Sequence, residues 1–188
     1  MELLVPPGSF LAAGPDLLDP NFLHAVVLIG QHSPGGAYGL VLNRLSPHTT
    51  DDVLDDSLAL GRARVPISLG GPVGLDTLQI LHRAPTRVEG GVELCDGLFL
   101  GGEFESLGRY VEQDPDAFRR DVRLFLGYAG WGAGQLEAEL AAGTWLPAPP
   151  EASAVFESDP AQMWRHVVRT LGESTEGFER QPPDPRWN

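Results

Sequence analysis

The chain has 188 residues, of which 42% are hydrophobic and 21% are charged, and this composition is typical of one ordinary globular domain. Its 26 acidic residues outnumber its 13 basic ones, and the formal net charge of −13 opposes nonspecific attraction to nucleic-acid phosphates. All the basic residues are arginine, which excludes Schiff-base chemistry and any nucleotide site that needs a Walker lysine.

The chain shows no membrane signal. Its longest apolar runs, such as residues 25–29, are far shorter than the ~20 residues of a membrane helix. Residues 1–7 lack a basic segment followed by a long apolar run, so we expect no signal peptide. Cys95 is the single cysteine, which excludes an intrachain disulfide and favours a reducing compartment. We therefore expect a cytoplasmic protein with no membrane partner.

The first third of the chain predicts strands. Residues 9–13 predict a short first strand, and residues 25–32 and 38–43 predict two more, joined by the turn-rich segment 33–37 as a hairpin. Both hairpin strands are almost continuously apolar, which is typical of burial on both faces. We therefore expect the hairpin to lie centrally, covered by helices or a second layer.

A helix start is predicted at residues 49–52, because hydroxyls cap a helix and acidic side chains favour its positive end. Val53, Leu54 and Leu58 are expected to face the interior of the protein. Further strands are predicted at 66–69, 77–82 and 92–95.

The second half predicts mainly helices. Residues 103–113 carry apolar side chains at helical spacing, and a short helix is expected to start at Asp114-Pro115. The last helix starts with Pro160 in its first turn and ends before Gly172. Short strands are predicted at 144–146 and 154–156.

A glycine-rich stretch at residues 127–134 joins a predicted strand at 122–126 to a predicted helix at 134–142. Glycine serves where the backbone needs positive φ or close approach. The spacing does not match the dinucleotide fingerprint, because Gln135 occupies the position of its last glycine. We favour a tight strand-to-helix turn packed against Trp131. The alternative is an anion or small ligand held by helix N-terminal amides, with Gln135 assisting.

The order of elements favours a single α+β domain over residues 1–172, because strands cluster early and helices late without a strict βαβ rhythm. We expect a central sheet that is mixed but mainly antiparallel and flanked by helices. In one alternative, this sheet is curled or barrel-like. Residues 173–188 are polar and predict a frayed tail.

His32 and Asn43 resemble active-site residues at strand ends. A hairpin turn near Gly35 puts Asn43 opposite Val27, so His32 lies about 16 Å away along the strand at ~3.3 Å per residue. The two side chains therefore cannot share one small site within the hairpin. The structural alternatives are a turn-stabilising hydrogen bond for His32 and a strand-end cap for Asn43.

Neither a metal site nor a cofactor is predicted. None of the five histidines stands in a metal-binding spacing, and Cys95 has no second cysteine. Cys95 is expected to be a buried free thiol. Trp131, Trp145 and Trp164 are expected in packing roles rather than as a stacking platform.

An arginine cluster is the one local argument for nucleic acid. Arg119, Arg120 and Arg123 alternate with acidic residues, which predicts a salt-bridged helix face. Direct binding of nucleic acid is therefore disfavoured.

Several landmarks in order resemble the YqgE/AlgH family of small bacterial proteins. They include GSFLAA at 8–13, DPNF at 19–22, GAYGLVLN at 36–43, GGPV at 70–73 and GYAGWGAGQLEAEL at 127–140. The resemblance covers roughly nine-tenths of the chain and implies a compact α+β domain with a central sheet flanked by helices. It carries over no catalytic residue, and some members are labelled transcriptional regulators. The glycine-rich segment around 90–106 departs from the family pattern.

Three functional hypotheses follow. The first is a noncatalytic binding or regulatory domain that acts through a protein partner or a small ligand. Its predicted cleft combines three segments, since glycine loops at strand ends often line concave sites. The candidate residues are Gly71, His82, Gly130, Trp131, Gly132 and Gln135. The second hypothesis is an enzyme with His82 or His32 as base, and the third is a regulator that binds DNA directly.

Overall fold

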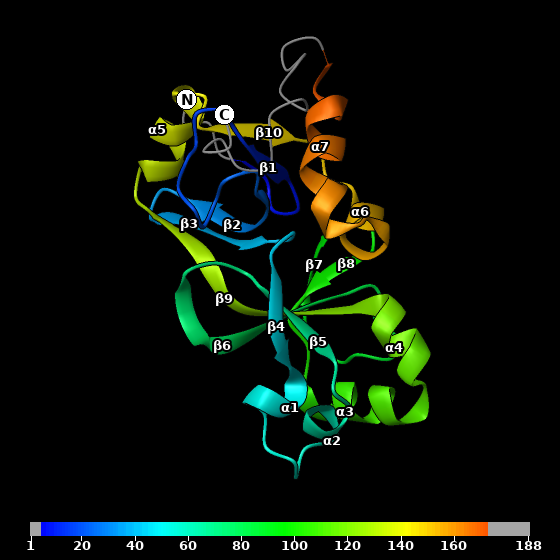
Figure 1. The fold of residues 1–188 in the computed structure, drawn as a ribbon. Helices are drawn as coiled ribbons and strands as arrows, with labels where there is room; N and C mark the ends of the chain where they lie inside the picture. Colours follow the sequence, from blue (N-terminus) through cyan, green and yellow to red (C-terminus); the bar gives the residue numbers. More distant parts are fainter. Residues whose placement is uncertain (1–4, 173–188) are drawn as a thin grey trace.

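The computed structural model describes residues 5–172 (Figure 1), so the tail predicted at 173–188 lies outside the described part. The strands are β1 (Phe10–Ala13), β2 (Val26–Ser33), β3 (Gly36–Val41), β4 (Leu45–Thr49), β5 (Pro66–Leu69), β6 (Val73–His82), β7 (Val92–Cys95), β8 (Leu98–Leu100), β9 (Val122–Gly132) and β10 (Trp145–Ala148). The helices are α1 (Thr50–Val53), α2 (Ala59–Arg62), α3 (Phe104–Gln113), α4 (Pro115–Asp121), α5 (Gln135–Ala141), α6 (Ala152–Glu157) and α7 (Pro160–Thr170). No helix in residues 5–172 is long and apolar enough to span a membrane.

The sheet is mixed and mainly antiparallel, as predicted. Its order is β10-β1-β2-β3-β9-β6-β8-β7, with β5 added beside β9 and β4 beside β5. The pairing of β5 with β9 is parallel, and the other pairings are antiparallel. The sheet is open rather than closed into a barrel, because its end strands β10 and β7 do not pair with each other.

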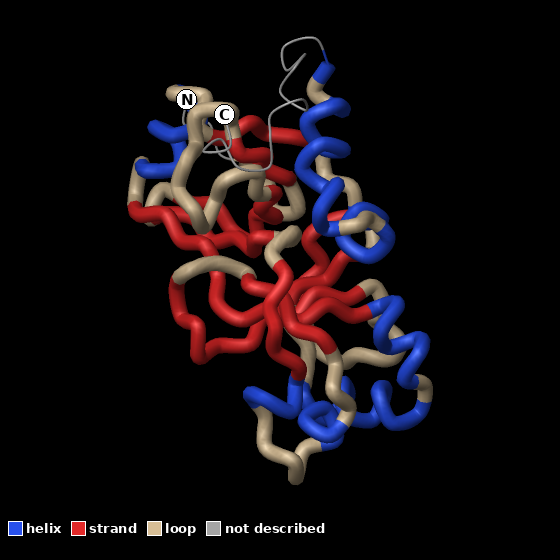
Figure 2. Tube along the Cα trace, viewed as in Figure 1, coloured by secondary structure: helices blue, strands red, loops and turns tan. Residues whose placement is uncertain are grey.

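Strand β9 runs through both halves of the molecule (Figures 1 and 2). Its C-terminal residues pair with β3, and its N-terminal residues pair with β5 and β6. One core packs β1, β2 and β3 against α7 and includes the buried Trp145 and Trp164. The second core lies under α3 and α4 and includes Phe118. The long strand thereby joins two hydrophobic cores in one fold.

The signals in the sequence that specify α7 act as predicted. Pro160 occupies the first turn, and the Asp159 side chain accepts from the Ala161 amide at 3.0 Å. The helix buries Trp164, whose indole donates to the Ala13 carbonyl at 2.9 Å and ties α7 to β1. Burial of one such large side chain contributes roughly 1.5–3 kcal/mol.

Several sequence predictions are wrong in detail. Residues 154–156, predicted as a strand, lie in α6, because burial against the sheet outweighs the strand preference of valine and phenylalanine. Val53 and Leu58 are 39% and 43% exposed, because α1 ends after one turn at Val53. Residues 127–132 extend β9 rather than forming a loop. Cys95 is only half-buried. The short elements β4, β8 and α2 were not predicted.

Candidate functional site

The glycine-rich stretch ends in a left-handed corner. Gly134, with φ of 73°, follows β9 and precedes α5. Gln135 closes this corner, because its Oε1 accepts from the Gly132 amide at 3.0 Å and its Nε2 donates to Glu139 Oε1 at 2.9 Å. The side chain of Gln135 therefore holds the turn, which agrees with the structural interpretation of this stretch.

Glu139 is a residue that the sequence did not single out. Its Oε2 accepts from the indoles of Trp131 and Trp145, each at 2.8 Å. These rings meet edge to face with centroids 5.9 Å apart, and they are 8% and 2% exposed. A charged acceptor satisfies indole donors that burial would otherwise leave unpaired. This carboxylate therefore joins β9, α5 and β10.

His32 lies beneath the same turn, with its side chain fully buried. Its Nδ1 accepts from the Val5 amide at 2.9 Å, and its Nε2 lies 3.1 Å from Glu137 Oε1. Because Nδ1 accepts, Nε2 carries the proton and lies close to the carboxylate, although the pair does not have hydrogen-bond geometry. His32 thus ties β2 to the N-terminal segment and to α5. The hydrogen bond expected within the hairpin turn is instead made to a segment 27 residues away.

Asn43 caps the opposite end of the hairpin. Its Oδ1 accepts from the Val26 amide at 2.9 Å, and its Nδ2 donates to the His24 carbonyl at 2.9 Å. The predicted register is wrong, because Val27 pairs with Val41 after a bulge between residues 29 and 31. His32 and Asn43 still lie at opposite ends of the hairpin, as expected, and Asn43 fills the predicted capping role.

The predicted cleft does not form as a whole, because His82 lies apart from the other candidate residues. Gly71 lies against the backbone of β9, where an added Cβ would be 2.2 Å from the carbonyl carbon of Tyr128. His82 ends β6 and pairs with Val122 at the other end of β9. Gly130 is eight residues further along that strand, about 26 Å away at ~3.3 Å per residue. The strand that was expected to stop at residue 126 separates them. A ligand-binding role for these residues stays a prediction.

His82 is fully buried beside the glycine-rich segment around residues 90–106. Its ring stacks on Phe99 with centroids 5.2 Å apart, and its Nδ1 accepts from the Ala84 amide at 3.3 Å. Burial lowers the pKa of His82, so the ring is neutral at pH 7. Its Nε2 has no hydrogen-bond partner among residues 5–172.

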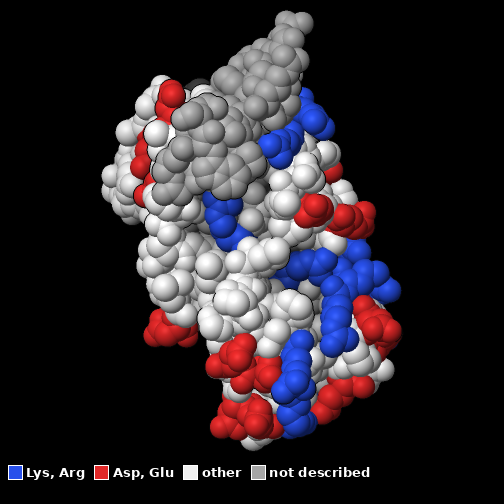
Figure 3. Space-filling model, viewed as in Figure 1, with Lys and Arg blue, Asp and Glu red and all other residues white. Residues whose placement is uncertain are grey.

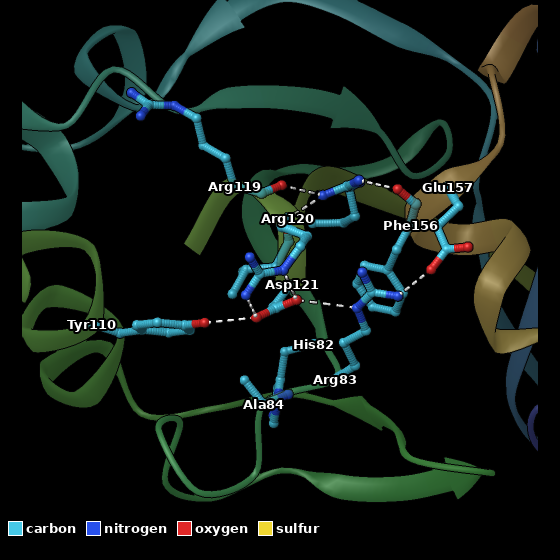
Figure 4. Close-up of polar contacts among 11 residues, drawn as sticks. His82, Arg83, Ala84, Tyr110, Arg119, Arg120, Asp121, Phe156 and Glu157 are labelled. Atoms are coloured by element: carbon cyan, nitrogen blue, oxygen red, sulfur yellow. Dashed lines mark hydrogen bonds and ion pairs between the residues drawn. The ribbon is translucent and has the colours of Figure 1, made fainter. Parts of the chain in front are cut away.

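A charged network beside His82 centres on Asp121 (Figure 4). This carboxylate accepts from Tyr110 at 2.8 Å and from Arg83 and Arg120 at 3.1 Å each. Burial opposes its ionisation, but the hydrogen bonds prevail and hold the pKa of Asp121 below its ordinary value. Burial, with the hydrogen bond to Asp121, raises the pKa of Tyr110 to about 12. The network is satisfied internally.

Two arginines extend this network to α6. Arg83 donates to Glu157 at 2.6 Å, and Arg123 donates to the carbonyls of Arg119 and Phe156 at 2.6 and 2.5 Å. Both guanidinium groups lie over the Phe156 ring, at 4.9 and 5.4 Å from its centroid. The contacts tie α6 to Arg83, next to β6, and to Arg123 of β9 (Figure 4).

Two hollows lie on either side of the first turn of α7, and Pro160 lines both. The Arg44 cavity, of about 470 Å³, lies between this turn and the loop before β2, and Asn43, Arg44 and Arg165 line it. The apolar groove, of about 310 Å³, lies between α6, α7 and the sheet. Its lining comprises Leu42, Leu45, Val65, Pro66, Ser68, Arg119, Val122, Arg123, Leu124, Phe125, Val155, Ser158, Pro160 and Met163.

Among residues 5–172, arginine is the sole charged residue type that lines these two hollows. The chain has twice as many acidic residues as arginines, so the absence of acid from both linings is informative. Figure 3 shows arginine side chains following one another across one face, from beside α7 past α4 towards α1.

Comparison with known proteins gives one family. The AlgH-like family model matches residues 10–176. The chain belongs to the AlgH-like family. A UPF0301 protein of Chlorobaculum tepidum is 37% identical over 90% of this chain and 88% of its own length. Another, from Anaeromyxobacter dehalogenans, is 43% identical over 90% of each chain.

The solved structures agree with the AlgH-like fold. The solution structure of AlgH from Pseudomonas aeruginosa aligns with a TM-score of 0.69, at 28% identity and 93% coverage of both chains. A crystal structure from Corynebacterium diphtheriae aligns with a TM-score of 0.73, at 24% identity, over 93% of this chain and 92% of its own. The family resemblance seen in the sequence is thus confirmed, and none of these names states a biochemical activity.

In this AlgH-like domain, the predicted site residues Trp131, Gly132 and Gln135 share one corner with His32 close beneath it. Arg44 was missed by sequence reasoning, although it directly follows the candidate Asn43. A single arginine after a strand forms no sequence pattern that would indicate a binding site, and only the folded structure shows that its side chain is half-buried.

Proposed function

We propose that this chain is a noncatalytic binding domain whose apolar groove takes a segment of a partner protein rich in acidic and bulky apolar residues. The observation that supports this proposal is the lining of the groove: among the described residues, each charged side chain in it is an arginine and most of the others are apolar. An acidic, apolar segment complements both properties. The single cysteine supports a reducing, cytoplasmic setting.

Arg123 supplies a fixed positive charge at the groove. It donates to three backbone carbonyls, of Arg119, Val122 and Phe156, at 2.5–2.9 Å. Burial lowers its pKa, and no carboxylate forms an ion pair with it within residues 5–172. A guanidinium held in this way meets a partner carboxylate without losing further side-chain freedom.

The rim of the groove offers an apolar anchor and a second charge. Leu45 is 73% exposed on the edge strand β4, so it has most of its surface left to bury. Arg119 has one carboxylate neighbour, Asp116, at 4.0 Å, and the Asp116 side chain is fully exposed. Such a pair contributes little and exchanges readily for a partner's carboxylate.

The test uses designed fluorescent peptides and anisotropy. One set alternates glutamate with leucine or phenylalanine, and the other keeps the apolar residues but replaces each glutamate by lysine. We expect the acidic set to bind. Leu45→Asp should weaken binding by about ten- to a hundredfold, since burying a leucine contributes roughly 1.5–3 kcal/mol and ~1.4 kcal/mol is tenfold.

Arg119→Glu tests the charge, and Arg109→Glu is its matched control. Both arginine side chains are 46% exposed, but Arg109 lies on α3 outside the groove. Weaker peptide binding in Arg119→Glu alone supports the proposal. Equal binding of acidic and basic peptides, or equal loss in both variants, contradicts it.

An enzyme with a histidine base is the second candidate, and one observation favours it. His82 is neutral because of burial, and its Nε2 lacks a partner within the described residues. Against it, neither hollow beside α7 includes His82. Exchange of the ring proton with solvent, followed by NMR, discriminates: an accessible base exchanges quickly, whereas a packed ring is strongly protected.

Direct DNA binding as a transcriptional regulator has the least support. Arg120 is paired with Asp121, and Arg62 and Arg64 are paired with Glu112 and Asp51. A gel shift at low salt tests this role, because an electrostatic DNA complex is tightest there. No shift at low salt excludes it.

A further inference from the structure

Arg44 places a positive charge in the Arg44 cavity, and no carboxylate among residues 5–172 forms an ion pair with it. Arg44 is half-buried between β3 and β4, and one of its N–H groups donates to the Leu23 carbonyl. Burial lowers its pKa, and no carboxylate pairs with it in the described part of the chain. Removing a guanidinium from water is costly unless a counterion compensates. Within the described residues, a negative charge is the feature that this position lacks.

The cavity has the size and the charge to supply that partner as a ligand. Its volume of about 470 Å³ falls within the roughly 300–1,000 Å³ typical of small-molecule sites. Arg165, from α7, also lines the cavity, and no acidic residue among residues 5–172 contributes to the lining. The planar fork of a guanidinium suits bidentate contact with carboxylate or phosphate oxygens.

The walls are fixed before any ligand enters. Asn43 bridges the Val26 amide and the His24 carbonyl at 2.9 Å each, which holds the residue next to Arg44. His24 stacks on Trp164 with centroids 4.1 Å apart. The backbone of His24 has φ of 53°, a strained value for a residue other than glycine, and such strain gathers at functional sites. A fixed wall lowers the entropic cost of binding.

We propose that the Arg44 cavity binds a small molecule through a phosphate or carboxylate group, with Arg44 as the principal anion contact. This site is separate from the apolar groove, so it goes beyond the proposed partner binding and does not depend on it. The ligand neutralises Arg44 and fills the space between the loop before β2 and the first turn of α7.

The experiment is a titration of the isotope-labelled full chain by NMR at constant ionic strength. The probes are inorganic phosphate, a phosphate monoester, citrate and acetate, with chloride as the reference. We expect saturable shifts of the amides of Ala161 and Gln162, which line the cavity. Shifts with phosphates alone identify a phosphate ligand, and shifts with carboxylates alone identify a carboxylate ligand. If neither the phosphates nor the carboxylates shift these amides beyond the chloride reference, the proposal is overturned.

Arg44→Met keeps the length of the side chain and removes the charge. We expect it to weaken anion binding at least about tenfold, the range of a charge-assisted contact. Arg109→Met removes an arginine of α3 that lines neither hollow, and it should leave the anion shifts at Ala161 and Gln162 unchanged. Unaltered anion affinity in Arg44→Met refutes the assignment. Should either variant fail to fold, Arg44→Lys, which keeps the charge without the fork, should bind phosphate more weakly than the parent chain.

Discussion

Glu139 offers the sharpest quantitative prediction about stability. Its Oε2 accepts from both Trp131 and Trp145, and these two rings are nearly inaccessible to solvent. Glu139→Ala leaves two buried indole donors without an acceptor. Each unsatisfied donor costs about 1–3 kcal/mol, so the variant should lose roughly 2–6 kcal/mol. That loss is a large part of the ~5–15 kcal/mol that stabilises a typical domain.

Urea unfolding at 25 °C, followed by far-UV circular dichroism, measures this loss. Glu105→Ala is the control, because the Glu105 side chain is 87% exposed and pairs with Arg109 on the helix surface. It should change the free energy of unfolding by no more than about 0.5 kcal/mol. Glu139→Gln, which keeps one amide oxygen as acceptor, should fall between the other two variants.

A double-mutant cycle then isolates the contact. Trp145→Phe removes the indole donor and keeps an aromatic ring, so Glu139→Ala should cost less in that background than in the parent chain. The reasoning fails if Glu139→Ala stays within about 0.5 kcal/mol of the parent. It also fails if the two substitutions are strictly additive.

The remaining predictions concern three charged or titratable positions. Arg123→Met should lower the free energy of unfolding by about 1–3 kcal/mol, because three carbonyls lose their donor, whereas Arg44→Met should lower it less, because one carbonyl loses its donor. Urea unfolding of both variants checks this difference in size. Asp121 has a lowered pKa when folded, so it stabilises the fold above the unfolded value of ~3.9, and this contribution is lost as pH falls further. Asp121→Asn should therefore be less stable than the parent at pH 7, with the difference shrinking below pH ~4 in acid titrations. His82 also has a lowered folded pKa, so its contribution is present above ~6.5 and declines as pH falls through the folded value. Stability measured by urea at pH ~7.5 and ~5.5 should differ less in His82→Phe than in the parent chain.

Local signals made much of the fold predictable. Strand β5 and helix α7 were found from their flanking residues, since Pro160 and Asp159 define a helix start by geometry alone. The segment at 154–156 failed because its apolar run is too short for periodicity to separate strand from helix. Strand β4 carries exposed residues and a proline, so nothing in its pattern distinguishes it from a loop.

The candidate site was less predictable because it depends on long-range placement. Gly71 and His82 are eleven residues apart in sequence, but Gly71 packs against Tyr128 of β9, whereas β6 carries His82 to the start of that strand at Val122. The sequence indicated a special corner at Gln135 and missed Glu139, which completes it. A glutamate on an exposed-looking helix position shows its two indole partners only once β9 and β10 are placed.

Mapping the peptide contact tests the proposed function most directly. The isotope-labelled chain is titrated with the acidic, apolar peptide, and amide shifts are followed by NMR. The proposed function predicts that the largest shifts fall at Leu45, Ser68 and Met163, around the apolar groove. Shifts confined to the corner at Gly132 and Gln135, or no saturable shifts, would contradict it.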